Sequence, residues 1–421
     1  MDCRCKAGGI ESAGSVKTCD FSRDAQTTVV SFLRRKAERA LQVGKMAGRM
    51  TSGPAGTSRL RERPNENNNG RVVFFGKWSM ASPAANTAEL DDVLSEPTAG
   101  VLQFLRQTPG DFLVLGAGGK MGLHLAAMLR RGLDVVDPGR RVVAASRFSS
   151  EDQHREFAQR RIETQRCDVL NPADLAKLPD IANVFVMIGT KFGTSGQEGR
   201  TWATNCFVPG LICQRFPKSR IAAFSTGNVY GLTDVARGGS VETDRLAPVG
   251  EYAMTALGRE RMYEYFSQAL AIPITLIRLN YSCELRYGVL VDIAQQVLAG
   301  EPVDVSMGSF NVIWQRDACA MSIQSLALAS SPARPFNVSG PEILGVREVA
   351  RAFGERMKKP VTFVGQEAPT ALLNNAALAF GMYGKPGATA EQMIDWISEW
   401  LLAGRPTLGK PTHFSSRSGD F

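Results

Sequence analysis

The sequence predicts an α/β fold: a doubly wound parallel sheet with a smaller C-terminal substrate lobe. Short apolar runs, typical of buried parallel strands, alternate with helical patterns between about residues 111 and 280. Strict alternation of this kind indicates a doubly wound sheet. A glycine-rich segment at residues 116–122 follows the first apolar run directly. The 421 residues, 44% of them apolar and 21% charged, are enough for one or two globular domains.

The elements are expected in a regular order. A helical pattern from about residue 87 leads into a strand at 111–115, and a helix at about 119–131 follows the glycines. Further strands are expected at 141–146, 162–165, 183–188, 220–225 and 274–279, with helices at 151–160, after Asn171, at 198–216 and at 252–270. Beyond residue 280, helices at 288–299, 317–329, 346–357 and 391–402, separated by short extended pieces such as 303–306 and 336–338, predict the smaller lobe. Ligands of open α/β sheets bind at the carboxyl edge of the sheet, so the site is expected there.

Residues 1–79 differ in composition from the rest of the chain, and we expect them to be mostly disordered apart from one helix at about 27–46. They hold 15 Lys and Arg against 7 Asp and Glu, which accounts for the whole formal net charge of +8. The remainder is neutral, so no nucleic-acid partner is expected. A basic targeting helix and a dispensable extension before Met80 both fit this segment. The expected division is a basic extension at 1–79, a dinucleotide-binding domain at 80–280, a substrate-binding lobe at 281–405 and a tail at 406–421.

The composition also bears on the compartment. The sequence contains no apolar run long enough to cross a membrane and no secretory pattern, so no membrane partner is expected. The eight Cys lack paired short spacing in the body of the chain, as free thiols of a reducing compartment do. We therefore expect a cytoplasmic protein. The three His lie far apart in the sequence, so no metal site is predicted.

The first motif that carries chemistry is the glycine segment between the first predicted strand and helix. Glycines at this position permit a tight turn and let backbone N–H groups approach a pyrophosphate at the helix N-terminus. The context predicts a dinucleotide-binding loop made of Gly116, Gly118, Gly119, Lys120, Met121 and Gly122.

The spacing of Gly116, Gly119 and Gly122 resembles that of the extended short-chain dehydrogenase/reductases, the NAD-dependent epimerase/dehydratase family, whose first domain is a Rossmann fold. Further motifs follow in the family's order over about residues 111–400, including Phe224-Ser225-Thr226-Gly227-Asn228-Val229-Tyr230-Gly231. The resemblance implies that the cofactor-binding set also contains Asp168, Val169, Ile188, Gly189, Lys191 and Asn205.

The same resemblance implies catalytic hydroxyls at Thr226 and Tyr252, with Ser225 beside them. In such a site a Tyr hydroxyl takes the proton of an alcohol while hydride passes to nicotinamide, and a Ser or Thr hydroxyl holds the oxygen. The family places a Lys four residues after this Tyr, where it lowers the pKa of the phenol, but here that residue is Ala256. Three interpretations remain open: a substitute cation, either Lys191 or Arg259; a weakly activated Tyr or rearranged chemistry; and a non-catalytic dinucleotide-binding regulator or scaffold.

Cofactor choice depends on the end of the second strand, which reads Ser146-Arg147. An acidic residue there would bind the ribose 2′-OH of NAD, whereas an Arg pairs with the 2′-phosphate of NADP. This pattern favours NADP, although an Arg147 that is solvated or stacked on adenine leaves NAD open.

For the substrate, Asn280 and Arg286 are the candidate contacts, with an ion pair as the alternative role of Arg286. The Arg with which epimerases often hold a nucleotide phosphate has no counterpart before Trp314, so a simpler sugar, sugar acid or polyol fits as well as a nucleotide sugar. The expected partner is a small carbohydrate-like alcohol or ketone, handled by an oxidoreductase or epimerase. Helices 198–216 and 252–270 fit either a homodimer interface or a cover for the sheet.

Overall fold

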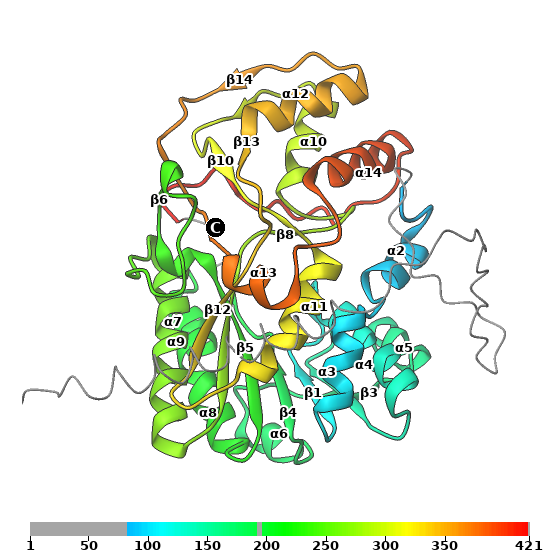
Figure 1. The fold of residues 1–421 in the computed structure, drawn as a ribbon, viewed down its shortest axis with the longest axis vertical. Helices are drawn as coiled ribbons and strands as arrows, with labels where there is room; N and C mark the ends of the chain where they lie inside the picture. Colours follow the sequence, from blue (N-terminus) through cyan, green and yellow to red (C-terminus); the bar gives the residue numbers. More distant parts are fainter. Residues whose placement is uncertain (1–81, 192–195, 420–421) are drawn as a thin grey trace, which may run out of the picture. The chain divides into compact units, whose positions relative to one another are not determined.

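A seven-stranded parallel sheet lies at the centre of the described structure (Figure 1). The computed structural model describes residues 82–191 and 196–419, so the expected helix at 27–46 and the character of residues 1–79 lie outside the described residues. The strand order is β12-β7-β5-β4-β1-β2-β3, and every neighbouring pair is parallel. The predicted fold class is confirmed. The strands are β1 Phe112–Leu115, β2 Val142–Ser146, β3 Glu163–Arg166, β4 Asn183–Val186, β5 Arg220–Thr226, β7 Ile274–Leu279 and β12 Arg334–Val338.

Helices cover both faces of this sheet, which explains why the inner strands β1 and β4 are largely apolar and fully buried, whereas the edge strand β3 is polar. In β1, Phe112 and Val114 point into one core, whereas Leu113 and Leu115 point into the other. The first core is completed by α3 (Ala99–Gln107), α4 (Gly122–Val136) and α11 (Gln315–Ser325), and α5 (Glu151–Gln159) lies at its edge. The second is completed by α6 (Pro172–Ala176), α8 (Val208–Arg215) and α9 (Gly250–Leu270).

The helix expected at 198–216 has a different internal structure. It consists of α7 (Glu198–Trp202), a π-helical turn (Ala203–Phe207) and α8. A π-turn inserts one extra residue into the helix, and such turns often lie at functional sites. Here the turn contains Asn205, which is fully buried and hydrogen-bonded to the segment after β4.

A second group of elements packs beside the carboxyl edge of the sheet. Helices α10 (Val289–Ala299), α12 (Val346–Met357) and α14 (Ala390–Leu402) share one core, to which α2 (Thr87–Leu94) adds two leucines. Short strands pair in twos around them: β8 (Ser282–Cys283) with β11 (Ile313–Trp314), β9 (Val303–Asp304) with β14 (Phe363–Val364), β10 (Ser309–Phe310) with β13 (Leu344–Gly345), and β6 (Thr233–Asp234) with β15 (Thr370–Ala371). Helix α13 (Ala377–Tyr383) packs against β12.

The predicted boundary between the two parts of the chain needs correction. The extended piece at 336–338 was expected in the smaller lobe, but it belongs to β12, which pairs with β7 in the central sheet. Helix α11, also from the predicted lobe, packs on α3 and α4. Residues 281–405 are therefore divided between the sheet and the lobe. The physical reason is that β12 is buried and apolar at Phe336 and Val338, and it continues the sheet at the edge of β7.

The predicted tail is also part of the folded structure as far as residue 419. Thr412 and Phe414 are buried, and the ring centroid of Phe414 lies 6.3 Å from that of Phe310. Arg417 donates to the carbonyl oxygen of Thr370 at 2.6 Å. Across the described residues, no helix has the length and apolar character needed to span a bilayer.

Candidate active site

The glycine turn between β1 and α4 leaves no room for larger residues at two positions. Gly116 has φ +82°, and a Cβ there would lie 2.9 Å from Ile188 and 3.0 Å from the carbonyl oxygen of Met187. A Cβ at Gly122 would lie 2.2 Å from the carbonyl oxygen of Ala117. The turn therefore needs glycine at both positions to bring the start of α4 against the end of β1. Backbone N–H groups at the start of a helix favour an anion.

A cavity of about 270 Å³ lies over this turn. Its lining contains most of the predicted cofactor-binding residues, which come from the ends of four neighbouring strands: Gly116, Gly118, Gly119, Ser146, Arg147, Asp168, Val169, Ile188 and Gly189. A Cβ at Gly118 would lie 2.8 Å from the hydroxyl oxygen of Ser146, so glycine at 118 lets the turn lie close to the end of β2. The carboxylate of Asp168 after β3 and the glycine turn after β1, the glycine cradle of this site, fit a dinucleotide in this cavity.

The lining also includes residues outside the predicted cofactor-binding set, and two of them, Arg200 and Thr204, lie on the helical segment that begins at residue 198. Arg200 lies on α7, immediately beyond the segment after β4, where no motif marks it. Arg200 and the exposed Arg147 both contribute to the lining of the same cavity. Two arginines in one lining favour a phosphate as part of the ligand.

Asn205 positions the cavity wall and is absent from its lining. Its amide oxygen accepts from the backbone N–H of Thr190 at 3.0 Å, and its amide nitrogen donates to the Thr190 carbonyl at 3.1 Å. The amide nitrogen also donates to the Thr255 hydroxyl at 2.8 Å. These bonds fix the segment after β4 against α9, so Asn205, expected in the cofactor-binding set, lies beside the cavity and outside its lining.

A second cavity, of about 200 Å³, contains the predicted catalytic residues. It is lined by Lys120, Met121, Lys191, Ser225, Thr226, Tyr252 and Asn280. Lys120 and Met121, predicted to contact the cofactor, thus line this cavity while the glycines before them line the first. The lining also includes Asn228, Tyr281, Tyr287, Gln315 and Thr412. The first four flank motifs found in the sequence, but nothing in the sequence pointed to Thr412.

Thr226 and Tyr252 form a hydrogen-bonded pair in this cavity. Burial raises the pKa of Tyr252, while the charge of Arg259 and the hydrogen bond with Thr226 act in the opposite direction. Thr226 is held in turn by Asn228, whose backbone N–H donates to the Thr226 hydroxyl at 3.2 Å. The two hydroxyls therefore have the adjacency that a proton relay requires.

The hydroxyl of Ser225 has a different hydrogen-bond partner from that of Thr226. Its hydroxyl donates to the buried carboxylate of Glu260 at 2.5 Å. Glu260 forms an ion pair with Arg278 at 2.7 Å, and Arg278 donates to the Tyr230 hydroxyl at 2.9 Å. Because both partners of this ion pair are almost fully buried, removing either would leave an uncompensated charge. Ser225 is thus hydrogen-bonded to the buried network of Glu260, Arg278 and Tyr230.

Ala256, at the position of the family's lysine, is fully buried against Val229 and Tyr230. Two cations instead act near Tyr252. The ammonium nitrogen of Lys191 lies 5.7 Å from the centroid of the Tyr252 ring, and burial lowers the pKa of Lys191 to about 8. The guanidinium of Arg259 donates to the carbonyl oxygen of Phe224 at 3.0 Å and to the Asn205 amide oxygen at 2.5 Å. Lys191 thus lies near the Tyr252 ring, and the charge of Arg259 acts on the Tyr252 hydroxyl.

The two predicted substrate contacts have different positions. Asn280 lines the second cavity, although its amide nitrogen already donates to Asn311 at 2.8 Å. Arg286 is absent from that lining and instead forms ion pairs with Asp91 at 2.8 Å and Glu284 at 3.1 Å. The alternative role, an ion pair, is the one observed, and the pair is largely buried.

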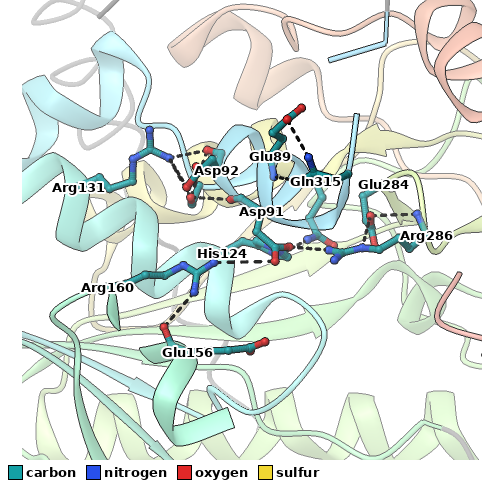
Figure 2. A network of polar contacts seen from close by, with 12 residues as sticks. Glu89, Asp91, Asp92, His124, Arg131, Glu156, Arg160, Glu284, Arg286 and Gln315 are labelled. Atoms are coloured by element: carbon teal, nitrogen blue, oxygen red, sulfur yellow. Dashed lines mark hydrogen bonds and ion pairs between the residues drawn. The ribbon is translucent and has the colours of Figure 1, made fainter. Parts of the chain in front are cut away.

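Figure 2 shows that Asp91 lies between Arg286 and His124. His124 Nε2 is 2.9 Å from the Asp91 carboxylate, and His124 Nδ1 is 2.7 Å from the Gln315 amide nitrogen. Helix α2, which precedes the sheet, is thereby linked through α4 to a residue of the second cavity. The ion pair with Arg286 also anchors the turn in which the Glu284 N–H donates to the Tyr287 carbonyl at 2.9 Å.

The strand order 3-2-1-4-5 around a glycine turn at β1 defines a Rossmann-type protein with its cavities at the switch point of the sheet. Residues 112–303 match the model of the NAD dependent epimerase/dehydratase family. The resemblance predicted from the motifs is therefore confirmed over that part of the chain.

Solved structures of similar fold include a UDP-glucuronic acid 4-epimerase from Bacillus cereus, with 17% identity and a TM-score of 0.59, covering 70% of this chain and 99% of that one. A dTDP-glucose 4,6-dehydratase from Streptomyces venezuelae has 17% identity and a TM-score of 0.59, covering 70% and 97%. A UDP-glucose 4-epimerase from Thermotoga maritima has 16% identity and a TM-score of 0.57, covering 70% and 99%. At such low sequence identity, the similarity to these structures shows the fold alone. No curated protein matches the chain.

Proposed function

We propose that this protein is an NAD(P)-dependent oxidoreductase or epimerase of the epimerase/dehydratase type that acts on a carbohydrate-like alcohol or ketone. The observation that carries this proposal is the hydrogen-bonded pair of Thr226 and Tyr252 in a cavity beside the glycine cradle. The family match supports it, as do the solved structures of similar fold, which are a UDP-glucuronic acid 4-epimerase and a dTDP-glucose 4,6-dehydratase with NAD.

The glycine cradle would hold the pyrophosphate of the dinucleotide, which when bound supplies hydride-transfer chemistry at its nicotinamide. Tyr252 accepts the proton of the substrate hydroxyl, and Thr226 holds the same oxygen by a hydrogen bond. A free Tyr has a pKa of about 10, and burial raises the pKa of Tyr252 further, so the phenolate needs a cation. Lys191 and Arg259 supply that charge in place of the absent lysine at position 256.

NADP is the preferred cofactor in this proposal. Arg147 and Arg200 line the first cavity together, and a guanidinium pairs with a 2′-phosphate through charge-assisted hydrogen bonds. NAD remains the alternative, since the Bacillus cereus epimerase and the Streptomyces venezuelae dehydratase of similar fold were solved with NAD. Asn280 is the remaining candidate for contact with the substrate.

The test is a comparison of Tyr252→Phe with the unchanged protein. Dinucleotide binding is measured by fluorescence titration, and turnover is measured with a panel of sugars, sugar acids and sugar nucleotides. Loss of the proton-transfer hydroxyl is expected to reduce turnover by about 10²–10⁴-fold while dinucleotide affinity stays within a few-fold. Tyr383→Phe, on α13 and outside the lining of both cavities, is the matched control. Unchanged turnover in Tyr252→Phe would refute the proton relay.

A non-catalytic dinucleotide-binding regulator is the second candidate, and the replacement of the family's lysine by Ala256 favours it. It predicts that dinucleotide binds while every substrate in the panel is left unchanged. Turnover that depends on Tyr252 would exclude this alternative.

We also propose that a second copy of the chain covers α7, the π-turn and α9. Large apolar side chains on these helices are exposed: Trp202 by 39%, Phe207 by 57%, Met254 by 47% and Tyr265 by 64%. Light scattering should give the mass of a dimer, and Phe207→Glu should give a monomer.

The five described cysteines are free thiols, which supports a reducing compartment such as the cytoplasm.

A further inference from the structure

Lys120 has an unusual position for a residue of a dinucleotide-binding turn. It lies between Gly119 and the start of α4, but its side chain lines the second cavity together with Thr226 and Tyr252. Its ammonium nitrogen lies 3.4 Å from the centroid of the Tyr287 ring, a cation–π contact. The side chain is thereby held on the side of the cavity formed by the turn before α10.

Lys191 brings a second ammonium group into the same cavity. Its nitrogen lies 6.0 Å from the centroid of the Tyr281 ring, and Tyr281 lines the same cavity. Burial lowers the pKa of each lysine to about 8; the charge of Lys410 adds to this effect at Lys120, and the charge of Lys120 adds to it at Lys191. A group with a pKa of about 8 is still roughly 90% protonated at pH 7. Two positive charges therefore repel one another in the cavity.

One acidic residue, Asp292, acts on both lysines and raises the pKa of each. Its carboxylate oxygen accepts hydrogen bonds from the backbone N–H of Thr412 at 2.7 Å and from the Thr412 hydroxyl at 2.6 Å. Asp292 is thus held by the C-terminal segment. A compact anion between the two ammonium groups would offset their mutual repulsion.

We propose that Lys120 binds a compact oxyanion of the substrate, a carboxylate or a phosphate, and so selects a sugar acid or sugar phosphate over a neutral sugar. The inference rests on the proposed function, because it takes the second cavity as the substrate site. At about 200 Å³ this cavity is smaller than the roughly 300–1,000 Å³ of sites for drug-sized ligands, which favours a small anion. Hydrogen bonds from an ammonium group to an oxyanion are about twice as strong as neutral ones.

The experiment measures binding of three probes to the full chain by calorimetry, with and without excess NADPH. D-glucuronate carries a carboxylate, D-glucose 6-phosphate carries a phosphate, and D-glucose carries neither. Lys120→Met removes the charge with little change in length, and Lys120→Arg retains it. Lys218→Met, at an exposed lysine just before β5 and hence at the opposite edge of the sheet, is the matched control.

We expect at least one anionic probe to bind about 10- to 100-fold tighter than glucose, the range of a charge-assisted hydrogen bond. The preferred probe distinguishes carboxylate from phosphate. Lys120→Met should remove the preference, whereas Lys120→Arg and Lys218→Met should keep it. In the unchanged protein the preference should fade as pH rises above about 8, since Lys120 then loses its proton; this measurement needs no variant to fold.

Three results would overturn the inference: equal or absent binding of all three probes, a preference that survives in Lys120→Met, and a parallel loss of NADPH affinity in that variant. The last would make Lys120 a contact of the cofactor phosphates. Failure of the proposed function is recognised separately, because the unchanged protein would then bind no dinucleotide while its preference for the anion persisted.

Discussion

The ammonium nitrogen of Lys191 lies 5.7 Å from the centroid of the Tyr252 ring. It is a cation that the fold brings to this tyrosine from the segment after β4, while the residue one helical turn beyond Tyr252 is a buried alanine. The positive charge in this part of the site thus comes from a different element than in the family pattern that the sequence resembles.

The first prediction follows from the pKa of Lys191, which burial lowers to about 8. Only the protonated lysine stabilises a phenolate at Tyr252, so kcat/KM is expected to fall as pH rises through about 8. Lys191→Met should lose this falling limb and part of the roughly 10²–10⁴-fold contribution of acid–base catalysis. The measurement is the pH dependence of kcat/KM, with Lys218→Met as the control. If kcat/KM of Lys191→Met still falls at the same pH, another group is responsible for that fall.

The second prediction concerns Ala256→Lys, which restores the family's residue. Ala256 is fully buried against Val229 and Tyr230, so a lysine there overpacks the core and buries a charge. We expect a destabilisation of about 1–3 kcal/mol or more and no gain in turnover. Thermal unfolding and kcat are the measurements, with Ala158→Lys at an exposed alanine of α5 as the control. A stable and more active Ala256→Lys would show that the helix can readjust.

The third prediction tests cofactor choice. Arg147 and Arg200 line one cavity, and each guanidinium–phosphate contact is a charge-assisted interaction of about 1.5–3 kcal/mol. Arg147→Ala and Arg200→Ala should each weaken NADP binding by roughly 10- to 100-fold and leave NAD binding nearly unchanged. Fluorescence titration with both cofactors measures this, and Arg334→Ala, an exposed position at the start of β12, is the control. An equal loss of affinity for both cofactors would indicate that the arginine stacks on adenine. Tighter binding of NAD than of NADP to the unchanged protein would refute the preference for NADP.

The fourth prediction concerns the ion pair of Asp91 with Arg286. Burial raises the pKa of Asp91, but the hydrogen bond with His124 and the charge of Arg286 outweigh burial, so the pKa lies below its usual value. A carboxyl whose pKa is lowered by folding stabilises the fold above its unfolded pKa, and this contribution is lost as pH falls through the folded value. Asp91→Asn should therefore cost about 1–3 kcal/mol near pH 7 and progressively less below about pH 4.

Urea unfolding of both proteins across this pH range measures the difference. Asp92→Asn is the matched control, because Asp92 is the neighbouring, more exposed carboxylate on the same helix. A difference between Asp91→Asn and the unchanged protein that does not vary with pH would mean that packing, rather than charge, is lost.

The sequence alone determined the sheet and the glycine turn, because each depends on a local pattern, whereas the grouping of Thr226 with Tyr252 came from the resemblance to the family. Strand–helix alternation fixes a parallel sheet, and parallel strands bring their carboxyl ends to one edge whatever the distance between them along the chain. The glycines at 116 and 122 are needed by the backbone itself, so they too are visible in the sequence.

Tertiary structure decided the charges around the site, because each depends on contacts between segments far apart in sequence. Arg286 was a candidate for the substrate, but Asp91, from a helix before the sheet, pairs with it. β12 joins the central sheet because β7 offers a parallel edge, which no local pattern specifies. Lys120, Lys191 and Thr412 come from a turn, a strand end and the C-terminal segment, and only folding brings them into one cavity. Side-chain burial and pairing are set by the whole fold, whereas backbone periodicity is set by a few neighbours.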